Sequence, residues 1–236
     1  MNILHINNTD LIGGRFSGYY MQQSLDNSYN VEMAVWDKKS RSSHVNLIPP
    51  GNHVLRFLAS QIMKLGFRLG LDGLTGSGGW LLPTRDYFKR ADIVHLLLIH
   101  NSTNFSILSL LMLSHKKPVV WTIHDSWAMT GGCVYSFECD RWLTGCSPRC
   151  PHPGRRSLFQ HYVPYLHWRI KKWILKRTDL TLIVASKLME DRVGRSPLLR
   201  HLACRKIPFG IDLDVFKPKS KIEYRKKMGI AIDSKV

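Results

Sequence analysis

Residues 117–125, KPVVWTIHD, decide the fold class of this chain. The run from Val119 to Ile123 is short and largely apolar, which indicates a strand that is buried on both faces. Strands of that kind are typical of parallel sheets covered by helices on both sides. Two polar residues, His124 and Asp125, follow the run directly, and ligands of such sheets bind beyond the carboxyl ends of the strands. This stretch therefore predicts a fold and also the position of a site.

Similar strand-like runs lie on either side of this stretch, at residues 2–6, 30–37, 91–99, 179–186 and 204–209. Helical apolar patterns separate several of them, most clearly at residues 54–69 and 105–114. Alternation of strands and helices predicts an α/β domain with a Rossmann-like, doubly wound parallel sheet.

Three positions follow the ends of predicted strands: Gly13-Gly14, His100-Asn101 and His124-Asp125. Glycines between a first strand and a first helix let the backbone approach a ligand, and the amino terminus of that helix attracts anions. A tight turn is the other interpretation of Gly13-Gly14. A histidine at a strand end can act as an acid, a base or a hydrogen-bond donor near neutral pH. A structural His-Asp pair that closes a loop fits His124 and Asp125 equally well.

The loop after Asp125 contains four cysteines within eighteen residues, Cys133, Cys139, Cys146 and Cys150, in the spacing C-x5-C-x6-C-x3-C. Four thiolates can hold one tetrahedral zinc ion, and we hypothesise a structural zinc here, with His152 as a replacement ligand. Packed free thiols and two disulfides are the alternatives.

The charge of the chain predicts an anionic partner. It has 34 Lys and Arg against 17 Asp and Glu, a formal net charge of +17. Residues 157–177 form a basic amphipathic pattern that could contact an anionic membrane or dock on the sheet, with a kink expected at Pro164. Residues 1–10 do not look like a secretory signal, and the most apolar window of the chain is interrupted by polar residues. We therefore expect a cytoplasmic protein. If the 157–177 helix contacts the membrane, the protein would be peripheral on its inner face.

Three segments carry a resemblance to a known family: PVVWTIHDSWAMTGGCVYSFECDRWLTGCSPRCP at 118–151, DLTLIVASKLMEDRV at 179–193 and IPFGIDLDVFKP at 207–218. Together they resemble bacterial glycosyltransferases of family four, in the branch that builds lipopolysaccharide and exopolysaccharide. With the Gly-Gly turn, the resemblance extends over nearly the whole chain.

The resemblance implies a GT-B architecture, in which one Rossmann-like domain holds the acceptor and a second holds the nucleotide-sugar donor. It implies transfer with retention and without a catalytic metal ion, from a nucleotide sugar to a glycan or lipid-linked acceptor. His124 would match the family's active-site histidine near the transferred sugar, and Gly13 and Gly14 would match its glycine turn near the donor phosphates. We also expect Asp125 to take part in catalysis and Asn101 and Trp127 to contact substrate. Phe209 departs from the asparagine that family members usually have before GID.

The resemblance also divides the chain. Residues 1–210 would form the acceptor-side domain, with a cysteine-rich loop at 124–156, and residues 211–236 would begin a donor domain whose remainder is not in this sequence. We therefore expect a truncated chain that is inactive alone. Two other hypotheses stay open: a zinc-stapled, basic nucleic-acid-binding module, and a non-catalytic remnant that binds only acceptor. For the leading hypothesis we expect no nucleic acid partner.

Overall fold

A computed structural model describes residues 1–10, 19–25, 28–49, 52–71, 73–100, 105–146, 150, 162–211, 213–214 and 216–235. In these ranges the chain forms a seven-stranded sheet in the order β3-β2-β1-β4-β5-β6-β7, and every neighbouring pair is parallel. The strands are β1 (Asn2–Thr9), β2 (Asn30–Asp37), β3 (Val45–Leu47), β4 (Ile93–Leu96), β5 (Val119–Ile123), β6 (Thr181–Val184) and β7 (Ala203–Lys206). This is a Rossmann-like α/β fold, as the sequence predicts.

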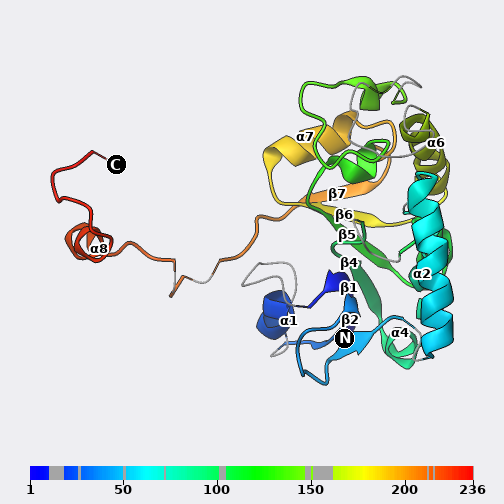
Figure 1. Cartoon of the computed structure of the whole chain (residues 1–236), viewed down its shortest axis with the longest axis horizontal. Coiled ribbons are helices and arrows are strands. Elements are labelled where there is room, and N and C mark those ends of the chain that lie inside the picture. Colours follow the sequence, from blue (N-terminus) through cyan, green and yellow to red (C-terminus); the bar gives the residue numbers. More distant parts are fainter. Residues whose placement is uncertain are drawn as a thin grey trace.

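Helices cover both faces of the sheet, so the sheet is doubly wound. Figure 1 shows α1 and α7 on one face and α2, α4 and α6 on the other. The helices are α1 (Tyr19–Leu25), α2 (His53–Arg68), α3 (Gly78–Leu81), α4 (Asp86–Arg90), α5 (Ser109–Lys116), α6 (Val163–Leu175), α7 (Lys187–Arg195) and α8 (Lys221–Lys227), with 3-10 turns at η1 (Leu82–Thr84), η2 (Ser126–Met129) and η3 (Arg141–Leu143).

The core lies between the central strands and these helices. Side chains of β1, β4, β5 and β6 that are at most 3% exposed form its centre: Leu4, Ile6, Val94, Leu96, Trp121, Ile123, Leu182 and Val184. Burial on both faces is most complete in β4 and β5, whose surrounding sequences are nearly continuous apolar runs, whereas β6 alternates buried and half-buried residues.

Two local predictions need correction. β3 has only three residues, too few for a recognisable pattern, and the sequence did not indicate it. Pro164 does not kink the helix within 157–177, because α6 begins at Val163 and places Pro164 in its first turn. The missing N–H of a proline costs nothing there, since the first amides of a helix have no partner within the helix.

The chain leaves the sheet after β7. Figure 1 shows α8 apart from the sheet, at the end of an extended segment. The division at residue 210 stays a prediction. Within the described ranges we find no helix with the length and apolar character needed to cross a bilayer.

Candidate active site at the carboxyl edge of the sheet

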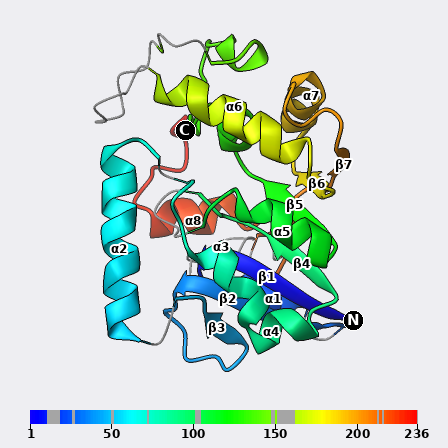
Figure 2. The ribbon, with the colours of Figure 1, turned by 90° about the vertical axis from the view of Figure 1, so that its right-hand side faces the viewer.

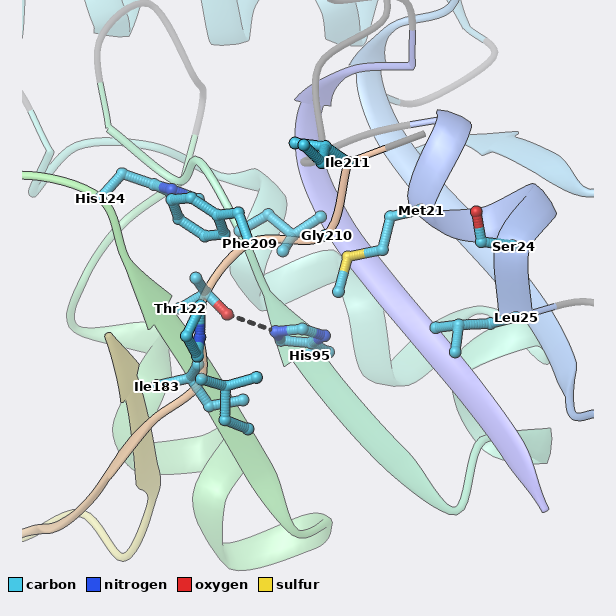
Figure 3. A pocket seen from close by; sticks show the side chains of 13 residues that line it. Met21, Ser24, Leu25, His95, Thr122, His124, Ile183, Phe209, Gly210 and Ile211 are labelled. Atoms are coloured by element: carbon cyan, nitrogen blue, oxygen red, sulfur yellow. Dashed lines mark hydrogen bonds between the residues drawn. The ribbon is translucent and has the colours of Figure 1, made fainter. Parts of the chain in front are cut away.

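A cavity of about 410 Å³ lies at the carboxyl ends of the central strands, beside the switch point between β1 and β4. Figure 3 shows side chains from α1, β4, β5 and β6 around it, with the segment after β7 crossing it. Its lining is mostly apolar, from residues such as Met21, Leu25, Ile183, Phe209 and Ile211, with polar groups from His95, Thr122 and His124. A cavity that combines an apolar wall with a few polar groups is the usual form of a small-molecule site.

His124 lines this cavity one residue past the end of β5, where the sequence predicts a site residue. Its ring stacks on Phe209, with centroids 5.5 Å apart and planes 27° from parallel. Burial lowers the pKa of His124 below its usual 6.5; Asp125 opposes the shift and His100 adds to it. The imidazole is therefore neutral at physiological pH, and a neutral imidazole can accept a proton from a substrate hydroxyl.

Two further histidines continue inward from His124 along neighbouring strands. His95 lines the cavity, and its Nε2 lies 2.7 Å from the Thr122 hydroxyl (Figure 3). His5 on β1 packs edge-on against His95, with ring centroids 5.1 Å apart. Burial is the main cause that lowers the pKa of His95 to about 4 and that of His5 to about 3. Both are therefore neutral, buried imidazoles at physiological pH.

Sequence reasoning missed His5 and His95 as members of the site. Each is a lone histidine within an apolar strand pattern. A polar residue in such a pattern was the only sign in the sequence that these positions could belong to a site. Their register partnership across β1 and β4 could not be known without the order of strands in the sheet.

Asp125 has a structural position in this arrangement. One of its carboxylate oxygens lies 2.8 Å from His100 Nε2, and the other accepts a hydrogen bond of 2.8 Å from the amide of Trp127, where it caps η2. With both oxygens engaged, the carboxylate fixes the turn that follows β5. The histidine that Asp125 pairs with is thus His100 and not its neighbour His124, and the predicted part of Asp125 in catalysis stays a prediction.

Trp127 does not line this cavity, but it lines a small adjoining pocket together with His100, His124 and Asp125. It is 4% exposed and stacks on His100 at 5.1 Å, while the ammonium group of Lys171 lies 3.5 Å from the centre of its ring. Lys171 also donates hydrogen bonds to the carbonyls of Trp127 and Thr130, at 2.6 and 3.2 Å. The substrate contact predicted for Trp127 stays a prediction. Gly13, Gly14 and Asn101 lie outside the described residues, and so does His152.

The structure does not assemble the predicted zinc site. In the described part of the chain, which includes all four cysteines of the loop, no three His, Cys, Asp or Glu side chains are arranged to hold a metal ion. Cys146 Sγ accepts a hydrogen bond from the amide of Gly131 at 3.2 Å, and burial is the main cause that raises the pKa of its thiol to about 11. The neighbouring thiols of Cys133 and Cys139 add to this rise in pKa, and packed free thiols stay an untested alternative to zinc.

Buried aromatic residues fix the cysteine-rich loop to the neighbouring helices. Trp142 is 3% exposed, and its carbonyl accepts a hydrogen bond of 2.8 Å from the indole of Trp168 on α6. The guanidinium of Arg192 from α7 lies over the Trp142 ring at 5.1 Å and donates a hydrogen bond to Ser136. The loop is thus fixed to two helices by packing and hydrogen bonds.

Comparisons with known proteins support a relationship to sugar transferases. No family model matches the chain. A candidate colanic acid biosynthesis glycosyl transferase, WcaC, from Escherichia coli (strain K12) is 32% identical over 120 residues, which are 48% of this chain and 29% of that protein. This chain thus matches less than a third of the length of that relative.

A solved structure has the same fold. The sucrose-phosphate synthase from Thermosynechococcus elongatus aligns with 98% of this chain and 53% of its own, with a TM-score of 0.52 and 15% identity. At this identity the likeness concerns the fold alone, and it agrees with the predicted Rossmann-like sheet.

Proposed function

We propose that this chain forms the acceptor side of a GT-B glycosyltransferase of family four, which moves a sugar from a nucleotide-sugar donor to a glycan or lipid-linked acceptor with retention at the anomeric carbon. The observation that carries the proposal is the placement of His124. A neutral imidazole at the tip of β5 faces a mostly apolar cavity in a chain related to a polysaccharide glycosyl transferase. The proposed setting is the cytoplasm, with polysaccharide biosynthesis as the process.

The cavity suits an acceptor that has both polar and apolar parts. His124, His95 and the Thr122 hydroxyl supply hydrogen-bonding groups on the strand side. Met21, Leu25 and Ile211 supply apolar surface on the opposite side, which fits the start of a lipid chain or the apolar face of a sugar ring. In this role His124 would accept a hydrogen bond from the attacking hydroxyl of the acceptor.

In this proposal the seven-stranded sheet with its helices would form one wall of the cleft in which a GT-B enzyme works. Residues 211–236 would connect this wall to the donor side. We propose that the polypeptide of residues 1–236 binds acceptor but transfers no sugar alone, because the transition state would lack the charges that the donor side supplies.

The test is equilibrium binding of octyl β-glucoside, below its micelle concentration, to the purified chain. We expect saturable binding that His124→Ala weakens by about tenfold, the loss of one good hydrogen bond to a buried site. His115→Ala, at an exposed position on α5, is the matched control and should bind like the parent chain. Equal binding by the His124 variant would contradict the proposed site.

A further inference from the structure

The long helix α2 presents a continuous apolar face to solvent. Five of its side chains, each more than half exposed, form this face: Val54, Leu55, Leu58, Ile62 and Leu65. At 100° per residue they lie within an arc of about 100°. Over the sixteen residues of the helix, only Gly66 is buried. A helix of this length inside a soluble core would normally bury such a stripe.

α2 is attached to the rest of the protein at one end. A Cβ at Gly66 would lie 2.3 Å from the Thr75 hydroxyl, so the last turn of α2 packs closely on the following segment. Among the described elements, none packs along the helix over its length. Figures 1 and 2 both show α2 at the outside of the molecule, on the side where α6 also lies.

The rest of the α2 surface is basic but not wholly polar. Arg56, Lys64 and Arg68 lie outside the apolar arc, together with Phe57 and Phe67, which are 61% and 65% exposed. Residues 38–71 contain six Lys or Arg and no Asp or Glu. A free apolar face with Lys and Arg on the other side is the pattern of a helix that lies in the headgroup region of a membrane. Anionic lipids attract such a basic segment, whereas a second copy of the same helix would bring like charges together.

We propose that α2 is an interfacial helix that docks this protein on an anionic membrane surface, with its apolar face in the lipid. This differs from the membrane contact expected for 157–177. α6 turns Val163, Trp168, Ile174 and Leu175 into the protein and exposes fewer apolar side chains, mainly Leu166 and Trp173. The proposal does not depend on the proposed transfer reaction, because it rests on the surface of α2 alone.

Sedimentation of the full chain with lipid vesicles tests the proposal. We expect the chain to bind phosphatidylcholine vesicles that contain about 30% phosphatidylglycerol, and to bind pure phosphatidylcholine much more weakly. The double substitution Leu58→Ser and Ile62→Ser should lower the vesicle partition coefficient by about tenfold or more. Since both side chains are exposed, the circular dichroism spectrum and melting temperature should not change.

Matched variants separate α2 from a general surface effect. Leu188→Ser with Leu213→Ser removes two side chains that are 68% and 71% exposed elsewhere, and it should leave vesicle binding unchanged. Lys64→Glu with Arg68→Glu keeps the apolar face and should weaken binding to anionic vesicles while affecting binding to neutral vesicles far less. This second α2 variant also decides the question if the serine variant does not fold.

Three results would overturn the proposal. The first is a serine variant that binds vesicles like the parent chain. The second is a loss of binding only in the double substitution Leu166→Ser and Trp173→Ser, which would assign the membrane contact to α6. The parent chain could instead form a dimer that the α2 variant dissolves, with no affinity for vesicles, which would assign the face to a second copy. In all three cases, binding of octyl β-glucoside at the His124 cavity would be a separate question with its own answer.

Discussion

Acidification should destabilise this fold through its buried histidines. His5 and His95 are 0% and 7% exposed, and their folded pKa values of about 3 and about 4 lie below the usual 6.5 of an unfolded chain. Between these values the unfolded state binds more protons than the folded state. The folded state is therefore not penalised for its two neutral histidines above about pH 6.5. Below that pH it loses stability relative to the unfolded state, as the pH falls toward the folded pKa values.

The size of the effect follows from these shifts. At about pH 5, each histidine is almost fully protonated in the unfolded chain and almost neutral in the folded one. This difference lowers the free energy of unfolding by about 2 kcal/mol per histidine. The pair therefore lowers the free energy of unfolding by about 4 kcal/mol between about pH 7.5 and pH 5, a large part of the 5–15 kcal/mol typical of a domain.

Urea unfolding followed by tryptophan fluorescence at these two pH values measures the effect. His5→Leu removes one titrating group without adding a polar atom to the core, so about half of the acid sensitivity should disappear. His115→Gln, at an exposed position, should retain all of it. An equal loss of stability in the parent chain and in His5→Leu would refute the reasoning, and so would a parent chain whose stability does not fall between pH 7.5 and 5.

Three further outcomes are expected. Trp142→Ala should lower the free energy of unfolding by about 3 kcal/mol, because it leaves a cavity under the cysteine-rich loop, and the loop cysteines should then react faster with Ellman's reagent. Trp80 is 46% exposed, so Trp80→Ala should have neither effect. Elemental analysis of the purified chain should find far less than one zinc per chain; one bound zinc, lost when Cys133 and Cys139 become serine, would restore the four-cysteine site. The polypeptide of residues 1–236 should release no measurable nucleotide from UDP-glucose in the presence of octyl β-glucoside, and steady turnover would show that one domain suffices.

The sequence predicted the parts of the fold that local pattern determines. The apolar run at 30–37 marks β2 to the residue, and the run before His124 marks β5 and the edge of the site. In both cases a short, mostly apolar run bounded by polar residues can be recognised without a structure.

What the sequence could not predict depends on contacts between distant segments. The row formed by His5, His95 and His124 requires β1, β4 and β5 to be neighbours, and only the topology shows this. The cysteine spacing suggested a metal ion, but Trp142, Trp168 and Arg192 fix the loop through contacts over 26 to 56 residues. The helical period of α2 likewise gave no sign that its apolar stripe faces solvent, because the same period is typical of a core helix.

The central claim is that the His124 cavity holds an acceptor sugar. The most direct measurement is a nuclear magnetic resonance titration of the isotope-labelled chain, following the ring signals of His124 and the methyl signals of Ile183 and Ile211. We expect octyl β-glucoside to shift these signals saturably and UDP-glucose to leave them in place, because the donor would bind to the other domain. Shifts at His124 with UDP-glucose but none with the glucoside would contradict the account.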